Sequence, residues 1–470
     1  KLYQEEPSPQ EDLEKIPLLQ ISDIKTEAKN YEYKENDIAG TKVITHDIFT
    51  NGIGYVSLYF NLKDIPFEYL PYVGLLTNLY GFMNTKNYSY TELTNKINLN
   101  TGGISTIATS LSDYVEYDKY TLLGKVRVKV LYENLPVAFD LMRELILNTD
   151  FSDEARMLEL LQMIKTRMQP SILSAGHSTA FKRAMSYISE MDAAREKLGG
   201  LDFYRLISDL IDNYDTKKTE LQGILTKIVS IVFKKENLIA DYIGEGKSHN
   251  LVYPLIETFA NNLSKSTDCF DKSEYKLEKL NEGLKTSGQV QYVAKVGNYR
   301  TGGLRPTGAL AVLKVIMGYD YLWNNIRVKG GAYGCMSGFA HSGVGYFVSY
   351  RDPNLKETLD IYDAAADYIE KFECSDRDMT KFIIGTIADI DAPQTPYDEG
   401  IGSFSAYFTH KKFEDRQRSR DEVLSCNVET IRGLAKYIRE IMKDEAICVV
   451  GAEDKIEANK DLFRNIGDLL

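Results

Sequence analysis

The feature that most constrains the fold is a pattern that the chain uses twice. The segment INLNTGG, at Ile97–Gly103, ends a predicted helix and leads into a predicted strand, and IRVKGG, at Ile326–Gly331, does the same about 228 positions later. Each is followed by a pair of strand-like runs and then by a matching helix start, NLPVAFDLM from Asn134 and NLKETLDIY from Asn354. A repeat of this length predicts two copies of one domain rather than a solenoid of short repeats.

Both copies mix strand-like and helical runs. In the first, KVITHDIF and GYVSLYFNL flank Asn51-Gly52, a dipeptide typical of a tight turn between paired strands, and Leu238–Ile243 is a further strand-like run. In the second, the apolar spacing predicts helices over Pro306–Met317 and Tyr319–Ile326, followed by a strand. The predicted class is α+β, with two homologous domains that each have an antiparallel-rich sheet and helices packed on it.

The domain boundary is predicted at a polar stretch, GEGKSHN, over Gly244–Asn250. Residues 1–23 are polar and contain prolines, which is typical of a linker, so they are expected to end a connection to another part of a longer protein. The first domain is then expected over residues 24–245 and the second over residues 246–470. The second domain contains the IRVKGG turn.

Charge and cysteine content exclude several classes of partner. The net charge is -12, which disfavours nucleic acids and anionic membranes as partners, and no apolar run approaches the ~18 residues of a membrane span. The five cysteines are odd in number and form no C-x-x-C pair. They argue against a disulfide framework and predict a reducing compartment, the cytoplasm or alternatively an organellar matrix.

The sequence has no complete catalytic apparatus of its own. Its five histidines lie at least sixty residues apart, and none belongs to H-E-x-x-H or to the inverted H-x-x-E-H, so no metal site is predicted in this chain. A nucleophile elbow and a phosphate-binding loop are also lacking from the sequence.

One segment, IRVKGGAYG, is a candidate site because Arg327 and Tyr333 flank the pair Gly330-Gly331 at a helix-to-strand turn. Arginine offers a fixed fork of donors and tyrosine a hydroxyl, and both suit a carbonyl or a developing oxyanion. The residues alone also permit a structural interpretation. Two glycines after a helix usually end it, and an arginine near a helix C-terminus usually interacts with the helix dipole.

Six segments, in order along the chain, carry a resemblance to one family of peptidases. They are LEKIPLLQISDI (Leu13–Ile24), LNEGLKTSGQVQYVAKVGNY (Leu280–Tyr299), YLWNNIRVKGGAYG (Tyr321–Gly334), SYRDPNLKETLDIYD (Ser349–Asp363), IIGTIADIDAPQTP (Ile383–Pro396) and CVVGAEDKI (Cys448–Ile456). With them the chain resembles the C-terminal half of the presequence-protease branch of the pitrilysin/insulinase zinc metallopeptidases.

This resemblance implies a protein of four homologous α+β domains in two halves that close around a peptide chamber. The chain would be the third and fourth domains, and its partners would be the N-terminal half of the same protein and unfolded peptide substrates. It implies a zinc-dependent metalloendopeptidase whose zinc is bound by the N-terminal half. The present chain would hold no cofactor and would be inactive alone.

By motif match, the resemblance assigns catalytic roles to Arg327 and Tyr333 and substrate binding to Arg327, Gly330, Gly331 and Tyr333. The arginine and tyrosine would reach across the chamber and hydrogen-bond the substrate carbonyl and the tetrahedral oxyanion. Two other interpretations stay open. The chain could be a non-catalytic partner subunit of a separate zinc-bearing chain, or a structural relative similar to the core subunits of respiratory complexes.

Overall fold

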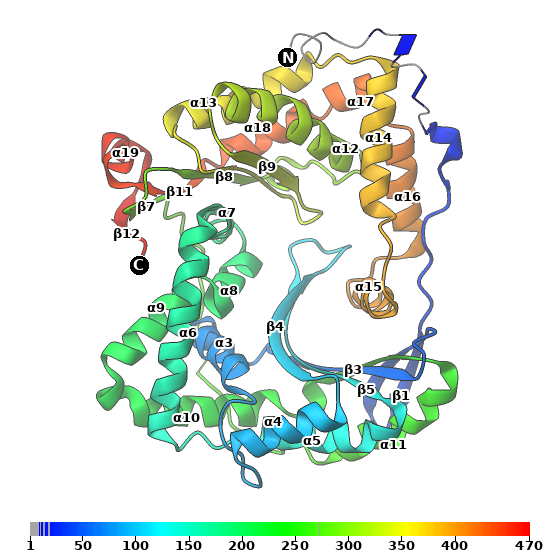
Figure 1. Cartoon of the computed structure of the whole chain (residues 1–470), viewed down its shortest axis with the longest axis vertical. Helices are drawn as coiled ribbons and strands as arrows, with labels where there is room; N and C mark the ends of the chain where they lie inside the picture. Colours follow the sequence, from blue (N-terminus) through cyan, green and yellow to red (C-terminus); the bar gives the residue numbers. More distant parts are fainter. Residues whose placement is uncertain (1–8, 10, 13–14, 17–18, 272) are drawn as a thin grey trace.

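Two units of the same design make up the computed structural model of the chain (Figure 1). The structure describes residues 9, 11–12, 15–16, 19–271 and 273–470. Of the predicted linker 1–23, residues 1–8, 10, 13–14 and 17–18 therefore lie outside the described residues. Each unit contains a six-stranded mixed sheet with helices packed on it, so the predicted α+β class is confirmed.

The first sheet has the order β1-β2-β6-β3-β5-β4. Its strands are β1 Lys34–Ile38, β2 Thr41–Asp47, β3 Ile53–Asn61, β4 Ile104–Ser112, β5 Tyr120–Leu131 and β6 Leu238–Gly244. The helices of this part are η1 Ile21–Asp23, η2 Phe67–Tyr69, α3 Leu70–Leu79, α4 Tyr90–Asn100, η3 Tyr132–Asn134, α5 Leu135–Leu147, α6 Glu154–Ser174, α7 Gly176–Met185, α8 Glu190–Gly199, α9 Leu201–Asp212, α10 Tyr214–Val232, η4 Lys235–Asn237 and α11 Gly246–Asn261.

The second sheet has the order β12-β7-β11-β8-β10-β9. Its strands are β7 Glu282–Thr286, β8 Tyr292–Asn298, β9 Gly334–Phe339, β10 Val344–Tyr350, β11 Ala446–Ala452 and β12 Asn465–Asp468. Its helices are η5 Tyr299–Gly302, α12 Ala309–Ile316, η6 Met317–Tyr321, η7 Trp323–Lys329, α13 Lys356–Glu370, α14 Asp376–Ile390, α15 Pro396–Phe408, α16 Phe413–Leu424, α17 Val428–Arg432, α18 Ala435–Lys443, α19 Glu453–Ala458 and η8 Lys460–Leu462. In the part of the chain that the structure describes, no helix is long and apolar enough to cross a membrane.

The predicted duplication is visible in the strand order. The series β2-β6-β3-β5-β4 of the first sheet matches β7-β11-β8-β10-β9 of the second. The first pair of each series is parallel, and the pairs that follow are antiparallel. The sheets differ only at the outer strand, since β1 lies antiparallel to β2 whereas β12 lies parallel to β7.

The prediction that Asn51-Gly52 joins two paired strands is wrong. The turn itself is present, with φ of 52° at Asn51 and 82° at Gly52, but β6 lies between β2 and β3 and pairs with both. Strand β6 is buried along almost its whole length. A strand that is apolar on both faces gains most from a central position, so it separates two strands that are neighbours in sequence.

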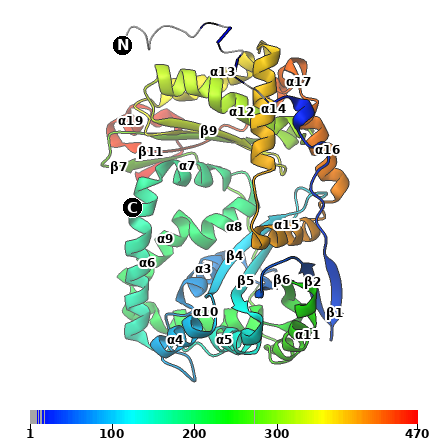
Figure 2. The ribbon, with the colours of Figure 1, turned by 45° about the vertical axis from the view of Figure 1, so that its right-hand side comes forward.

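Each unit lends a helix to the sheet of the other (Figures 1 and 2). Helix α7 of the first unit packs on the second sheet, where Ala180 and Ala184 join an apolar cluster with Ala294. Helix α15 of the second unit packs on the first sheet, where Phe404 stacks on Tyr59 with ring centroids 4.3 Å apart. The two helices occupy equivalent places, because α7 is the second helix after α5 and α15 is the second after α13.

The equivalent hairpins of the two units meet at their tips. Tyr114, between β4 and β5, stacks on His341, between β9 and β10, with ring centroids 3.7 Å apart. His341 donates from Nε2 to the Tyr114 carbonyl at 2.8 Å. Burial, together with the cations Arg300 and Lys411, lowers the pKa of His341, so the ring is neutral in this contact near neutral pH.

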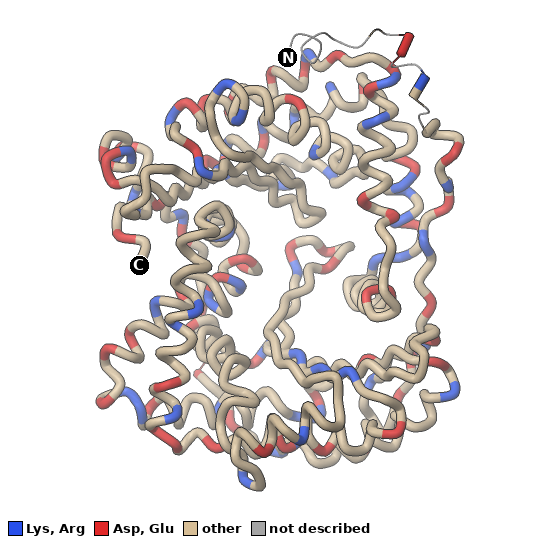
Figure 3. The backbone as a smooth tube through the Cα atoms, in the orientation of Figure 1, with Lys and Arg blue, Asp and Glu red and all other residues tan. Residues whose placement is uncertain are grey.

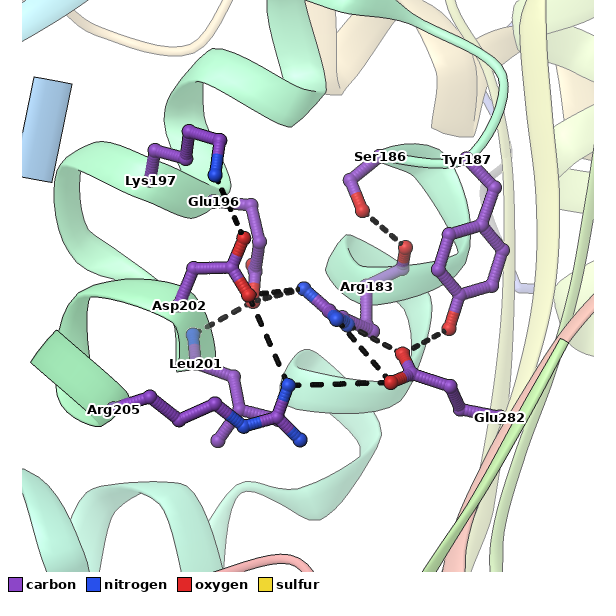
Figure 4. Close-up of polar contacts among 9 residues, drawn as sticks. All are labelled: Arg183, Ser186, Tyr187, Glu196, Lys197, Leu201, Asp202, Arg205 and Glu282. Carbon is purple, nitrogen blue, oxygen red and sulfur yellow. Dashed lines mark hydrogen bonds and ion pairs between the residues drawn. The ribbon is translucent and has the colours of Figure 1, made fainter. Parts of the chain in front are cut away.

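A buried ion network joins α7 to the second sheet (Figure 4). Arg183 of α7 contacts Glu282 of β7 at 2.5 Å and Asp202 at 2.7 Å, and it lies 3.6 Å from Glu196. The Tyr187 hydroxyl donates to Glu282 at 2.6 Å. Burial alone would lower the pKa of Arg183, but Glu282, Asp202 and Glu196 raise it, so the guanidinium stays charged. The network ties the two units together at one point.

The packing of α11 bears on where the units divide. This helix follows the predicted boundary, yet it contacts β2, β6 and α5 of the first unit. Its counterpart α19 likewise follows the matching strand β11 and contacts β11 and β7 of its own unit. We therefore propose that the first unit extends through Phe270, which belongs to its apolar core.

The segment before β1 runs along the second unit, beside α14 and α16 (Figure 2). Arg420 of α16 donates to the Lys25 carbonyl at 2.9 Å, and Ala28 donates to the Gln417 side chain at 2.9 Å. Acidic and basic residues are interspersed over both units (Figure 3).

Candidate functional site

The candidate turn follows a helix that changes its winding. Helix α12 continues into η6 and η7, which are π-helical, and ends at Lys329. The sequence predicts helix here but does not distinguish π from α winding, because both have nearly the same apolar spacing. Single π turns inside helices are frequent at functional sites. The segment with Arg327 therefore has an unusual backbone directly before the turn.

The two glycines are required by the turn itself. A Cβ on Gly330 would lie 2.6 Å from the Ile326 carbonyl oxygen, and Gly331 has φ of +81°. The Gly331 N–H donates to the Arg327 carbonyl at 3.0 Å, and the Asn354 side chain donates to the Gly330 carbonyl at 2.7 Å. These contacts account for both glycines as turn residues, and their predicted role in substrate binding stays a prediction.

Arg327 and Tyr333 lie on one side of this turn with their polar groups free. The Arg327 guanidinium lies 4.1 Å above the Trp323 ring and 5.6 Å from the centre of the Tyr333 ring. Within the described residues, the guanidinium of Arg327 makes no hydrogen bond or ion pair. Tyr333 is 66% exposed, and its ring packs edge-on against Tyr350 at 5.8 Å. The site thus presents a fork of donors and a hydroxyl on a fixed aromatic base.

A buried carboxylate supports the turn from behind. Asp352 follows β10 and exchanges backbone hydrogen bonds with Gln291 at 2.7 and 2.8 Å. Its side chain accepts from the Asn354 N–H at 2.9 Å and from the Thr358 hydroxyl at 2.7 Å. Burial raises the pKa of Asp352. Burial, with Asp352 nearby, also raises the pKa of the Cys335 thiol to about 11, so this cysteine is a thiol and not a nucleophile at neutral pH.

Trp323 and Tyr350 belong to the site but do not stand out as site residues in the sequence. Trp323 precedes Arg327 by four positions on a helix, the spacing at which side chains meet, and this spacing could have identified it. It is the only tryptophan of the chain. Tyr350 contacts the His177 ring of α7 at 4.8 Å, so the base of Tyr333 includes a residue of the other unit. Nothing in the sequence pattern indicates that contact.

The described residues do not provide a zinc site. The five histidines have other partners or packing neighbours; His46, for example, is fully buried and lies 2.8 Å from Asp241. Throughout the part of the chain that the structure covers, no three His, Cys, Asp or Glu side chains are grouped as metal ligands. By itself, the turn can bind and polarise a carbonyl group, but it offers no nucleophile.

Two family models match the chain. The model for the domain associated with peptidases of family M16, subfamily C, matches residues 1–210, and the model described as "PreP C-terminal domain" matches residues 281–453. The second contains the Arg327–Tyr333 turn.

Relatives match the chain over almost its whole length. "Protein HypA" of Clostridium perfringens is 39% identical over 472 residues, which cover 100% of this chain and 48% of the relative. "Presequence protease 1, chloroplastic/mitochondrial" of Arabidopsis thaliana is 31% identical over 465 residues, which cover 98% of this chain and 43% of the relative. The chain thus spans about half the length of these curated relatives.

Solved structures share the fold. A conserved protein from Enterococcus faecalis V583 superposes with a TM-score of 0.64 at 12% identity, covering 90% of this chain and 99% of that one. A structure described as the peptidase M16 inactive domain from Pseudomonas fluorescens superposes with a TM-score of 0.60 at 15% identity, covering 90% and 98%. At these identities, the likeness concerns the fold alone.

Proposed function

Because the chain belongs to the presequence-protease family of M16 peptidases, we propose that it is the C-terminal half of a zinc-dependent oligopeptidase that degrades unfolded peptides in a closed chamber. Zinc would be held by the N-terminal half, since the described residues of this chain do not fit it. The partners are that half and the peptide, in a reducing compartment such as the cytoplasm or an organellar matrix.

The observation that carries the proposal is the state of the two side chains at the turn. Tyr333 is exposed, and the Arg327 guanidinium is held over Trp323 without a hydrogen bond among the described residues. Donors that are fixed in place but unused cost little reorganisation when a substrate arrives. In the proposed mechanism, Arg327 and Tyr333 hydrogen-bond the carbonyl of the scissile peptide and stabilise the oxyanion that forms on it.

The test is cleavage of a quenched fluorogenic peptide. We expect no cleavage by this chain alone and zinc-dependent cleavage when it is mixed with its N-terminal half. Arg327→Ala and Tyr333→Phe should each lower the rate of the mixture by roughly 10²- to 10³-fold. Tyr319→Phe is the matched control, because Tyr319 is 75% exposed on the same helix and loses the same hydroxyl. It should leave the rate unchanged.

Three results would contradict the proposal. Zinc-dependent cleavage by this chain alone would reveal a metal site in it. Full activity of both variants would remove Arg327 and Tyr333 from the reaction. An inactive mixture whose halves demonstrably associate would favour a non-catalytic partner, in keeping with the solved M16 domain described as inactive.

A further inference from the structure

We propose that a cavity at the junction of the two hairpin tips binds an oxyanion, supplied either by carboxylates of an acidic peptide or by free phosphate. The cavity has a volume of about 820 Å³ and lies where Tyr114 and Val115 of the first unit meet the second unit. The rest of its wall comes from η5, α12, the β9–β10 turn and α16. It is distinct from the Arg327–Tyr333 turn.

Its charge is opposite to that of the whole chain. Five cationic side chains line it, against two carboxylates, although the chain carries a net charge of -12. The cations are Arg300, Arg305, Lys314, Lys411 and Arg418. A concave site lined mainly by one sign of charge concentrates ions of the other sign.

Both carboxylates of the wall are already engaged. Asp415 accepts from the Arg418 guanidinium at 2.7 Å and from the Lys412 N–H at 3.1 Å. Glu422 accepts from the Thr307 hydroxyl at 2.9 Å and from the Gly308 N–H at 2.5 Å. Asp415 therefore neutralises Arg418, and Glu422 caps the start of α12. The remaining cations keep their charge.

Lys411 is the cation that most needs an anion. It is partly buried, and its ammonium lies 5.2 Å from the centre of the Tyr114 ring. Among the described residues, no carboxylate lies within ion-pair distance of Lys411, Arg305 or Lys314. Burial and the neighbouring Arg416 lower the pKa of Lys411, although Asp415 opposes them. A bound oxyanion would offset this unfavourable burial of charge.

The position of the cavity suggests how a peptide could reach it. Phe339 and His341 line the cavity, and Tyr333 lies just before the other end of β9. At 3.3 Å per residue, the six positions from Tyr333 to Phe339 span roughly 20 Å. An acidic group about six residues from the scissile bond would span the same distance. This last step rests on the proposed function, whereas binding of an oxyanion does not.

The experiment measures binding to the 470-residue chain without any hydrolysis. The probe is a fluorescein-labelled peptide that ends in three glutamates, compared with one that ends in three glutamines, by fluorescence anisotropy. We expect the glutamate peptide to bind roughly tenfold more tightly or better, since hydrogen bonds to charged groups are the strong ones. Displacement of the probe by pyrophosphate would extend the site to free phosphate, and a lack of displacement would restrict it to carboxylates.

Variants locate the binding. Lys411→Gln and Arg305→Gln should each weaken the glutamate peptide several-fold and leave the glutamine peptide unchanged. Lys265→Gln is the control, because it removes the same charge from an exposed position outside the cavity. Arg305 is exposed, so its variant keeps the test valid if Lys411→Gln lowers the melting temperature. Equal binding of the two peptides would overturn the proposal, as would an equal loss in the Lys265→Gln control.

Discussion

Removing the guanidinium of Arg183 should destabilise the protein and partly uncouple its two units. Arg183 is 4% exposed, and the substitution Arg183→Met keeps most of its volume while leaving buried carboxylates without their cation. Breaking a buried ion pair from one side typically costs about 3–5 kcal/mol. Glu282 would keep the Tyr187 hydroxyl at 2.6 Å, and Asp202 would keep Lys197 at 3.4 Å. We therefore expect the lower end of that range, about 3 kcal/mol.

Urea unfolding measures this cost with two probes. Trp323 is the only tryptophan and lies in the second unit, so its fluorescence monitors that unit, while circular dichroism monitors both. In Arg183→Met, the fluorescence transition should separate from the dichroism transition, because the contact between α7 and β7 is weakened. Arg143→Met is the control, since its ion pair with Asp140 is exposed and contributes at most about 1 kcal/mol.

A second variant tests the physical cause. Glu196 is the most buried carboxylate beside Arg183, and burial raises its pKa. Adding Glu196→Gln to Arg183→Met removes a buried charge that has lost its partner, so the double variant should recover about 1 kcal/mol or more. The reasoning is refuted if Arg183→Met costs no more than the Arg143→Met control, or if the double variant is no more stable than the single one.

Three further predictions concern other parts of the fold. Phe404→Ala should cost about 3–5 kcal/mol in the free energy of unfolding, measured in urea, because its ring is fully buried between the units; Phe49→Ala, at an exposed position, should cost little. Gly331→Ala should cost about 1 kcal/mol or more because of its positive φ, whereas Gly223→Ala, in the middle of α10 with free space around it, should stabilise the protein by about 0.5–1 kcal/mol; equal effects on the melting temperature would contradict this. The lowered pKa of His341 means that the unfolded chain binds more protons below pH 6.5, so stability should fall as the pH falls from 6.5, and His341→Gln should reduce that fall; identical pH profiles of the melting temperature would count against it.

The sequence predicts the repeated unit well because the repeat is local. The helix–glycine–strand segments at Ile97–Gly103 and Ile326–Gly331 both occur where predicted, and each precedes a pair of antiparallel strands. The position of Arg327 and Tyr333 at a helix-to-strand turn also follows from local spacing. Their roles in substrate binding stay predictions, since the structure holds no substrate.

The long-range contacts could not be predicted in the same way. An apolar face on α15 indicates that Phe404 is buried, but it does not indicate that the partner is Tyr59 of the other unit. Likewise, Asn51-Gly52 predicts a turn, yet the place of β6 between the flanking strands depends on which strand gains most from central burial. The sequence pattern records which side chains avoid water and not which surface covers them.

The exchange of α7 and α15 gives a single chain the organisation of a two-fold symmetric dimer whose subunits have been joined covalently. In a true dimer of identical chains, every substitution appears twice, at both copies of a contact. Here, the two copies can change independently. Where the second unit has Arg327 and Tyr333, the first unit has Leu99 and Ser105 at the same distances from its own glycine pair. Covalent joining thus permits one copy to specialise its turn while the other keeps the scaffold.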